Sequence, residues 1–447
     1  MLSALQVPES ADLRTGLRPR IIKRAPRIGV LYPSGWGNLG DEAILQATFE
    51  GLRQQWPNAV LRAFTLHPER TATNHDVEAE YLTGVNPPMF HSPRDVNPFP
   101  VRAARALAHR TRRIPLAGRM CSIAADLAAA MVFEPVSVRS AWRWLQTADL
   151  LLAAGGGQLD AVWGGTWGQP YALARWAWLA RRAGVPFAFL SVGFGGAPSW
   201  LSRRLMRYAV RGAAYCSVRD IGSRALTQGL GVNRELPVVP DLAFALECGP
   251  PLPRSRPGYD IGISPMVYLR PGSWPREDRV AYARIVALWA DLVTARVIQG
   301  DRVHLFVSDP GDMSAVWEVW ARLSDQARAG CSVSQAKTPD QLLEFFRGID
   351  VVISSRLHGV LLALVAGRPV LALSHERKVR AVMTDAGMFN FSTDLTTATI
   401  DQVQATLRNL VGQLDECSQN LREYVARARA AIHRQEEFLP QLLKSDQ

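Results

Sequence analysis

An arginine and a histidine stand two residues apart in DVVISSRLHGVLLALVAGRPVLAL, Asp350 to Leu373, where an apolar strand is expected to become an apolar helix. Arg356 carries a fixed charge on a planar group that can hold a carboxylate or phosphate through two parallel hydrogen bonds. His358 titrates near neutral pH and would lie at the start of the helix, whose free amides favour an anion. The segment therefore predicts an anion site, with a buried structural histidine as the alternative.

Further cations are expected at other strand ends. Lys378 follows the next predicted strand, PVLALS, so two adjacent strand ends would each carry a cation. In SVRD, Arg219 and Asp220 end an earlier strand, where an ordinary surface ion pair is the alternative. Because ligands of open parallel sheets bind at the carboxyl ends of the strands, these positions predict a binding cleft.

A glycine-rich loop precedes the first predicted helix. GWGNLG, residues 35–40, is a literal GxGxxG, but Asp41 follows Gly40 directly, and a carboxylate there would repel the pyrophosphate of a dinucleotide. Two interpretations stay open. Either Asp41 caps the helix after a plain glycine turn, or the loop lines a cleft in which Asn38 and Asp41 contact a sugar or a catalytic group.

Three consecutive glycines, Gly155, Gly156 and Gly157, follow the predicted strand ADLLLAA. Glycines let the backbone approach a ligand closely, although a simple turn would also use them. Walker A, GxSxG, HExxH and DxD motifs are absent, which disfavours hydrolases, kinases and metal-dependent sugar-nucleotide transferases.

The elements that must position these residues alternate between strands and helices, from RIGVLYP to PVLALS. This alternation predicts an α/β protein with two Rossmann-like domains facing a cleft, and a long charged helix that closes the chain. We expect a flexible basic arm at 1–24, an N-terminal α/β domain at 25–247, a Pro-rich linker at 248–258 and a C-terminal α/β domain at 259–447.

The composition limits the classes of protein and partner. The chain has 447 residues, 48% hydrophobic and 20% charged, with a net charge of +11 that favours anionic partners. Its five scattered cysteines predict neither disulfides nor a zinc site, and a cytoplasmic location is expected. No apolar stretch reaches the roughly 18 residues of a spanning helix, and no signal peptide is recognised.

A basic helical insert is predicted at about 101–145. VRAARALAHRTRR alternates cations with Ala and Leu, and SAWRWL adds two tryptophans. The pattern suits a peripheral helix on the anionic inner face of the cytoplasmic membrane, or equally a solvated helix packed through its Ala and Leu residues. Nucleic acid is an unlikely partner, because aromatic residues are not interleaved in a known binding motif.

Taken together, GWGNLGDEAIL, LLLAAGGGQLD, SVRDIGS, PDLAFAL and SSRLHGVLLALVAGRPVLAL resemble the polysaccharide pyruvyl transferase family, in family order from about Arg27 to Met388. The resemblance implies a fold like that of GT-B glycosyltransferases. It also implies transfer of pyruvate from phosphoenolpyruvate to a sugar, commonly as a cyclic ketal on two hydroxyls. The donor-binding positions implied by the resemblance are Arg356, Leu357, His358, Arg219, Lys378 and Arg270.

The implied chemistry suits these residue types. Phosphoenolpyruvate carries a carboxylate and a phosphate, which Arg356 and Arg219 would hold. His358 would protonate the methylene carbon, and Asp41 would take the proton of the attacking hydroxyl. No metal or cofactor is expected. The acceptor would be a sugar of a polysaccharide or lipid-linked oligosaccharide precursor; the alternatives are a GT-B glycosyltransferase using a nucleotide sugar and a non-catalytic anion- or glycan-binding protein.

Overall fold

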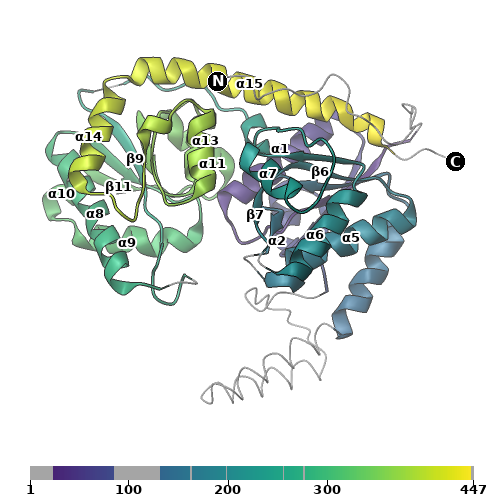
Figure 1. Ribbon diagram of the computed structural model, residues 1–447. Helices are drawn as coiled ribbons and strands as arrows, with labels where there is room; N and C mark the ends of the chain where they lie inside the picture. Colours follow the sequence, from purple (N-terminus) through teal and green to yellow (C-terminus); the bar gives the residue numbers. More distant parts are fainter. Residues whose placement is uncertain are drawn as a thin grey trace, which may run out of the picture. The chain divides into compact units, whose positions relative to one another are not determined.

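Two six-stranded sheets, each with all its strands parallel, organise the chain (Figure 1). The computed structural model describes residues 24–84, 131–161, 164–197, 199–254, 256–274 and 277–443. By its internal contacts the chain forms two units. The first contains the described residues of Met1–Trp36, Thr48–Asp241 and Arg434–Gln447, and the second contains Gly37–Ala47 and Leu242–His433. The domain limits expected from the sequence stay predictions.

The sheet of the first unit has the strand order β3-β2-β1-β4-β6-β8. Its strands are β1 (Arg27–Leu31), β2 (Val60–Thr65), β3 (Glu78–Tyr81), β4 (Leu150–Ala154), β6 (Phe187–Val192) and β8 (Tyr215–Val218). A separate small pair is formed by β5 (Leu159–Asp160) and β7 (Phe194–Gly196). Strands β4, β6 and β8 consist mostly of apolar residues and are buried along their whole length, as expected of a parallel sheet covered on both faces.

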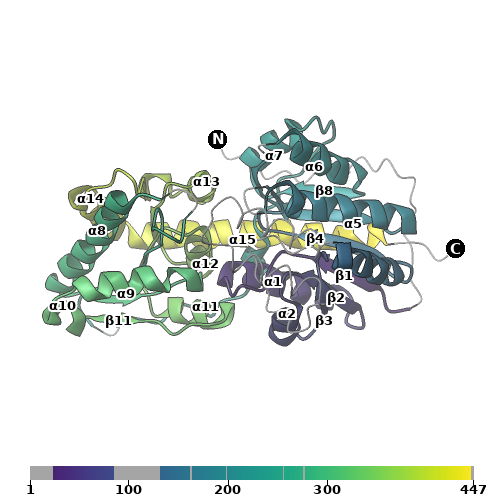
Figure 2. The same cartoon turned by 90° about the horizontal axis from the view of Figure 1, so that it is seen from below.

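Helices connect these strands as crossovers. They are α1 (Leu39–Gln55), α2 (Pro68–His75), the helical residues 131–145, η1 (Gly165–Trp167), α5 (Gln169–Ala183), α6 (Trp200–Gly212) and α7 (Ile221–Gln228). Side chains fix their first turns: Ser199 accepts a hydrogen bond from Ser202 N at α6, and Asp220 accepts one from Ser223 N at α7. Figure 2 shows α5 and α6 side by side along this sheet.

Trp144 lies in the core of the first unit, so the expectation that the tryptophans of the basic insert face a membrane is wrong for this residue. Its side chain is 4% exposed and its ring contacts Phe64 edge-on at 5.2 Å, while Trp176 contacts Phe64 at 4.3 Å from another side. Trp142 is partly buried against the same core. These tryptophans therefore stabilise the fold instead of forming an exposed interfacial helix. The Arg-rich stretch Val101–Arg113 lies outside the described residues.

The sheet of the second unit has the order β11-β10-β9-β12-β13-β14. Its strands are β9 (Asp260–Ser264), β10 (Arg302–Leu305), β11 (Cys331–Val333), β12 (Val351–Ser354), β13 (Val370–Leu373) and β14 (Ser392–Thr393). The helices and 3-10 turns are η2 (Leu242–Ala245), α8 (Arg279–Ile298), η3 (Pro310–Asp312), α9 (Met313–Arg322), α10 (Asp325–Ala329), α11 (Pro339–Arg347), α12 (Leu357–Val365), α13 (Arg377–Asp385), η4 (Phe389–Phe391) and α14 (Ile400–Val411).

The helix α12 is apolar on all sides, and eight of its nine residues are buried. A helix of this kind belongs in the centre of a unit, so the chain before and after it is held firmly. It ends where Gly367 takes a left-handed φ of 67° before Pro369 begins the approach to β13. The residues at its N-terminus therefore stand on a rigid element.

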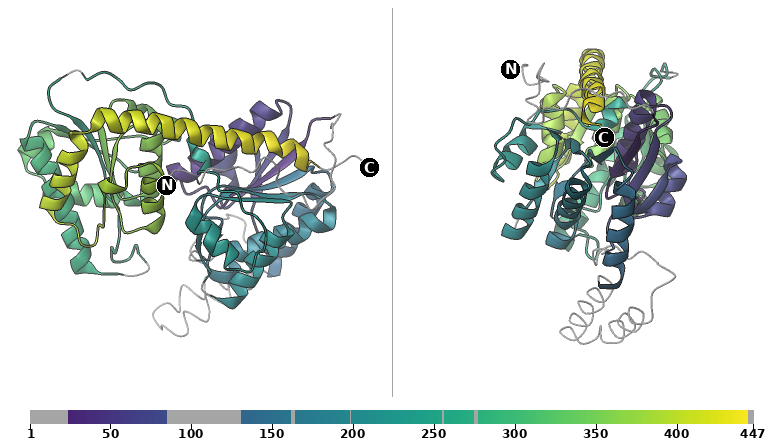
Figure 3. Two further views of the ribbon diagram at one scale, coloured as in Figure 1. Left: turned by 45° about the horizontal axis from the view of Figure 1, so that its top comes forward. Right: turned by 90° about the vertical axis from the view of Figure 1, so that its right-hand side faces the viewer.

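A long helix ends the described chain, as expected. It is α15 (Leu414–Phe438), drawn in yellow in Figure 3, followed by the 3-10 turn η5 (Leu439–Leu442). No helix among the described residues combines the length and the apolar character needed to cross a membrane.

Candidate functional site

Polar side chains of the second unit gather at the carboxyl ends of four parallel strands. Tyr268 and Trp274 follow β9, Asp309 and Asp312 follow β10, Arg356 and His358 follow β12, and His375, Glu376 and Lys378 follow β13. In the sheet, β10, β9, β12 and β13 are consecutive neighbours. The parallel topology thus brings segments that are far apart in the sequence to one edge.

Arg356 is held by a buried carboxylate. Its Nε lies 2.6 Å from Asp312 Oδ2 and its Nη2 lies 2.8 Å from Asp312 Oδ1, so the two side chains form a bidentate pair. Asp312 is fully buried and also accepts a hydrogen bond from Val267 N. Burial alone would lower the pKa of Arg356, but the hydrogen bonds and charge of Asp312 outweigh it and raise this pKa above its ordinary value. The guanidinium is therefore permanently charged and fixed in direction.

The same pair limits what Arg356 can still bind. An arginine has five N–H groups. Asp312 takes two of them, which leaves three of the five for another acceptor. Asp309 Oδ2 lies 3.8 Å from Nη2, and the Trp274 ring lies 5.7 Å from the guanidinium carbon. Arg356 is therefore a bidentate donor as predicted, but its Nε–Nη2 edge is already bound to Asp312.

The N-terminus of α12 lies beside Arg356, which is its N-cap residue. The Arg356 side chain makes no capping hydrogen bond to this helix. The backbone of the first turn forms the positive end of the helix dipole, which favours an anion. Leu357 contributes only such backbone, because its side chain is 4% exposed and belongs to the core.

His358 packs against the start of α1. A Cβ atom at Gly40 would overlap the His358 ring, so only glycine leaves space for the imidazole in this position. The backbone amide of Leu39 donates to Ser308 O at 2.7 Å, which ties the α1 N-terminus to the segment after β10. Gly40 thus determines where the side chain of His358, a predicted catalytic residue, lies.

Asn38, and not Asp41, is the N-cap of α1. The Asn38 side-chain oxygen accepts hydrogen bonds from Gly40 N at 2.9 Å and Asp41 N at 3.4 Å, while its Nδ2 donates to Asp309 at 3.3 Å. The interpretation with Asp41 as cap is therefore wrong. Asp41 stands in the first turn of α1, where its charge favours the helix dipole.

Three aromatic rings form a cluster that reaches Arg356 through Trp274. Tyr268 and His375 stack with centroids 3.7 Å apart, and Trp274 meets Tyr268 edge-on at 5.4 Å. Burial lowers the pKa of His375 below its ordinary value, although Glu376 and Asp394 act in the opposite direction. Lys378 is half exposed, with its Nζ 3.3 Å from Glu376. The edge therefore holds the carboxylates of Asp309, Asp312 and Glu376 as well as the predicted cations.

Arg270 is engaged elsewhere in the second unit. Its Nε donates to Glu318 at 3.0 Å and its Nη1 donates to Ser273 Oγ at 3.0 Å. No described contact links it to Arg356. Its donor-binding role stays a prediction.

In the first unit, Arg219 lies beside Gly193, whose amide donates to Gly156 O at 2.6 Å. The Arg219 guanidinium is buried between Asp241, 3.2 Å away, and Asp220, 3.5 Å away. Burial lowers its pKa, but the two carboxylates outweigh this effect and raise the pKa above the ordinary value. A Cβ atom at Gly193 would press on this guanidinium. The surface-pair interpretation of Arg219 does not hold, because the pair is buried.

Two of the three consecutive glycines are needed for conformation. Gly155 and Gly156 have φ of 49° and 61°, and a Cβ atom at Gly156 would overlap the Tyr32 hydroxyl. Gly157 has open space around its Cα. A tight turn against Tyr32 therefore explains the first two without a ligand, and a binding role of this loop stays a prediction.

Four residues of this edge were missed from the sequence: Asp309, Asp312, Tyr268 and Trp274. A signal existed for the two aspartates, because SDPGD follows the strand HLFV directly and places acids at a strand end. Tyr268 and Trp274 stand in a loop with no regular pattern. Among the described residues, no group of three or more His, Cys, Asp and Glu side chains is arranged to hold a metal ion.

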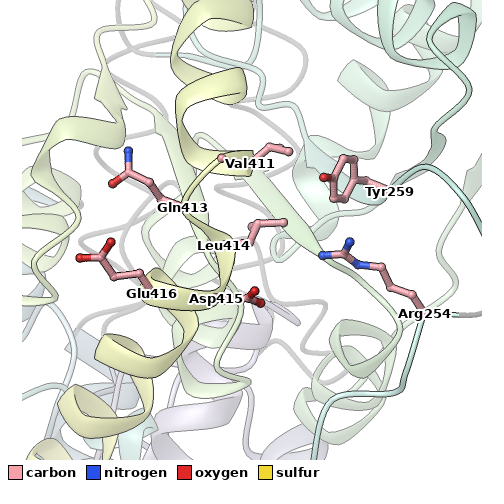
Figure 4. Close-up of a pocket in the computed structure, with 8 residues that line it drawn as sticks. Arg254, Tyr259, Val411, Gln413, Leu414, Asp415 and Glu416 are labelled. Carbon is pink, nitrogen blue, oxygen red and sulfur yellow. The ribbon is translucent and has the colours of Figure 1, made fainter.

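A cavity of about 350 Å³ lies at another place in the second unit. It is lined by residues of the α14–α15 junction together with Arg254 and Tyr259, and Figure 4 shows the Arg254 guanidinium directed toward Leu414 and Asp415. Arg254 also pairs with Asp350 at 3.0 Å and lies over the Tyr259 ring at 4.7 Å. None of the predicted site residues lines this cavity.

Solved structures share the fold at low sequence identity. The Staphylococcus aureus protein MnaA in a UDP co-structure aligns with a TM-score of 0.54 at 10% identity, over 93% of this chain and 96% of that one. UDP-GlcNAc 2-epimerase from Neisseria meningitidis gives 0.51 at 10% identity, over 92% and 99%. Anabaena Alr3699/HepE in complex with UDP-glucose gives 0.51 at 12% identity, over 92% and 98%. These likenesses confirm the expected GT-B-like fold.

The sequence comparison identifies the family. None of the curated proteins compared with the chain matches it. The profile of the family described as polysaccharide pyruvyl transferase matches residues 38–377, which begin at the Asn38 cap and extend through Arg356 and His358 to Arg377. This chain is therefore a member of the polysaccharide pyruvyl transferase family, and a transferase.

Proposed function

We propose that this protein transfers the pyruvyl group of phosphoenolpyruvate to sugar hydroxyls and releases phosphate. Family membership supports pyruvyl transfer as the reaction class. The observation that carries the proposal is the N-terminus of α12, where the positive end of a buried helix stands beside the fixed charge of Arg356. Backbone amides and a guanidinium are the donors that carboxylate and phosphate groups prefer.

Arg356 binds the donor through the N–H groups that Asp312 leaves unused. Asp312 holds the guanidinium in one orientation, so little conformational entropy is lost when the donor binds. The predicted partner for the second anionic group, Arg219, belongs to the other unit and is itself held by two carboxylates. Lys378 is a further predicted contact whose side chain is half exposed.

His358 acts as the acid. It gives a proton to the methylene carbon of phosphoenolpyruvate, which becomes a methyl group and leaves C2 electron-deficient. A sugar hydroxyl adds to C2 and loses its proton. A second hydroxyl then forms a new C2–O bond as the C2–O bond to phosphate breaks. Of the two protons released by the hydroxyls, one returns to His358 and the other leaves with phosphate, whose charge Arg356 stabilises.

Two carboxylates are candidates for the base that accepts one of these hydroxyl protons before it passes to His358 or to the departing phosphate. Asp41 follows Gly40, whose backbone contacts the His358 ring. Asp309 lies 3.8 Å from Arg356 and is 29% exposed on its side chain. We retain Asp41 as the proposed base. Loss of turnover in Asp309→Asn but not in Asp41→Asn would transfer the role to Asp309.

The family implies a sugar or polysaccharide acceptor. We propose an acceptor in a polysaccharide or lipid-linked oligosaccharide precursor, reached at the inner face of the cytoplasmic membrane. The net charge of +11 supports contact with an anionic surface.

Phosphate release tests the proposal. Phosphoenolpyruvate is offered with a panel of bacterial glycan intermediates, and UDP release from UDP-glucose is followed in parallel. Acceptor-dependent release of phosphate supports pyruvyl transfer. Release of UDP with no release of phosphate would establish a glycosyltransferase, and binding of phosphoenolpyruvate without phosphate release would establish a non-catalytic binding protein.

A further inference from the structure

The first unit contains a long stretch without acidic residues. Between Asp160 and Asp220 the chain has no Asp or Glu, but it has eight Arg and five Trp residues. Two of the helices from this stretch, α5 and α6, pack against each other along the sheet (Figure 2). These two helices thus carry six arginines with exposed or partly exposed side chains, Arg181, Arg182, Arg203, Arg204, Arg207 and Arg211, and no acidic residue.

The exposed side of α6 is a basic stripe that begins with a tryptophan. Four residues spaced by about one turn, Trp200, Arg204, Arg207 and Arg211, lie within an arc of about 60° and extend for about 16 Å along the helix. All four are exposed, and Trp200 is 71% exposed. The opposite side of α6 is fully buried through Met206, Ala209 and Val210. The stripe therefore stands on a fixed helix.

A second exposed tryptophan lies near the start of this stripe. Trp167 of η1 is 64% exposed, and its neighbour Thr166 is hydrogen-bonded to Ser199 at 2.9 Å and to Ser202 at 2.8 Å, in the first turn of α6. On α5, Trp178 is 49% exposed with the Arg182 guanidinium 5.7 Å from its ring. Large exposed aromatics beside arginines are costly in water and suit a boundary between polar and apolar surroundings.

We infer that the α5–α6 layer of the first unit is a docking surface for an anionic lipid bilayer. The arginines face lipid phosphates, and the tryptophan rings enter the headgroup region, where indole groups are most stable. The length of the arginine stripe and the absence of acidic residues from this stretch of sequence favour an extended anionic plane over a small soluble anion. This surface is separate from Arg356 and His358 in the second unit, and the inference does not depend on the proposed function.

Vesicle binding with matched charge variants tests the surface. The full-length protein is sedimented with phosphatidylcholine vesicles that contain phosphatidylglycerol, and with vesicles of phosphatidylcholine alone. The surface variant carries Arg204→Gln, Arg207→Gln and Arg211→Gln. The control variant loses the same charge from exposed helix positions of the second unit, through Arg322→Gln, Arg408→Gln and Arg422→Gln.

Wild type and control are expected to bind the anionic vesicles, and the surface variant is expected to bind about 10²-fold more weakly. Equal binding by all three proteins, an equal loss in both variants, or no binding by wild type would overturn the inference. A wild-type preference for a single-stranded oligonucleotide at physiological salt, lost in the surface variant, would overturn it in favour of nucleic acid. Circular dichroism melting curves confirm that each variant is folded.

Quenching by brominated lipid gives a second measurement that does not depend on charge. Quenching of tryptophan fluorescence is expected to fall in a Trp167→Ala, Trp200→Ala variant and to stay at the wild-type level in Trp317→Ala, whose side chain is 50% exposed on the second unit. Unchanged quenching in the double variant would contradict insertion of these rings.

Discussion

At the scale of single residues, the candidate site depends on contacts that fix two side chains. The backbone of Gly40 is in contact with the His358 ring, and the buried Asp312 carboxylate holds the Arg356 guanidinium. Both contacts join segments far apart in the sequence. Neither Gly40 nor Asp312 needs to touch a substrate, so we regard them as positioning residues.

Replacing Gly40 by alanine is expected to move the His358 ring. The new methyl group would overlap the ring, so the imidazole must shift, and phosphate release should fall about 10²-fold because proton transfer depends on geometry. Gly212→Ala is the matched control, since its surroundings leave room for a methyl group. Wild-type turnover in Gly40→Ala would show that the position of His358 is unimportant.

Replacing Asp312 by asparagine is expected to leave the Arg356 charge without its buried partner. Loss of one member of such a pair costs about 3 kcal/mol of unfolding free energy. The dissociation constant for phosphoenolpyruvate should also rise, because the guanidinium is no longer held in one direction. Asp309→Asn, which removes a more exposed carboxylate 3.8 Å away, should change stability by less than about 1 kcal/mol. Chemical denaturation and titration calorimetry distinguish the two, and equal effects would refute the special role of Asp312.

At the scale of elements, the strands and helices bring the residues of the candidate site together and fix their positions. The consecutive strands β10, β9, β12 and β13 carry the polar residues to one edge, and the apolar helix α12 anchors Arg356 and His358 in the core. The helical residues 131–145 anchor the first unit in a similar way through Trp144.

Trp144→Ala should destabilise the protein strongly, because a fully packed indole is replaced by a cavity. The expected loss of unfolding free energy is about 3–5 kcal/mol. Trp142→Ala removes a partly buried indole from the same helix and should cost clearly less. The measurement is urea denaturation of both variants, and a loss in Trp142→Ala as large as that in Trp144→Ala would contradict the assignment of Trp144 to the core.

The stacked His375 should make the protein less stable in mild acid. Its pKa is lowered in the folded state, mainly by burial, so the unfolded chain binds the proton more readily. Above the unfolded pKa of about 6.5, His375 does not lower the free energy of unfolding. As the pH falls from there through the lowered folded pKa, the loss of unfolding free energy grows. His375→Phe keeps a ring against Tyr268 and should show a smaller loss of unfolding free energy between neutral pH and pH about 5. An identical pH dependence in both proteins would count against this role.

At the scale of the whole molecule, much of the fold was predictable and part of the site was not. Periodic apolar segments predicted the parallel sheets and the final helix, because strand and helix patterns are local. Arg356 and His358 were found because SSRLHG combines a strand end, a helix start and two polar side chains. SDPGD marks Asp312 as an acid at a strand end, but its pairing with Arg356 arises only through the tertiary fold. No local pattern marks Trp274, which lies near Arg356, or Tyr268, which contacts Trp274.

The location of the exposed basic surface was also not predictable from the sequence. The density of Arg and Trp at 101–145 predicts a membrane-facing helix and a solvated, packed helix equally. The described part of that segment buries Trp144, while Trp200, the most exposed tryptophan among the described residues of the first unit, starts the arginine stripe of α6. Exposure depends on which side of each helix packs on the sheet, so composition alone does not locate the surface.

The most direct test of the central claim compares His358→Ala with wild type in two measurements, phosphoenolpyruvate binding by calorimetry and acceptor-dependent phosphate release. If His358 is the acid at the α12 N-terminus, the dissociation constant stays near the wild-type value while turnover falls by about 10²-fold or more. Wild-type turnover in His358→Ala would contradict the proposed chemistry.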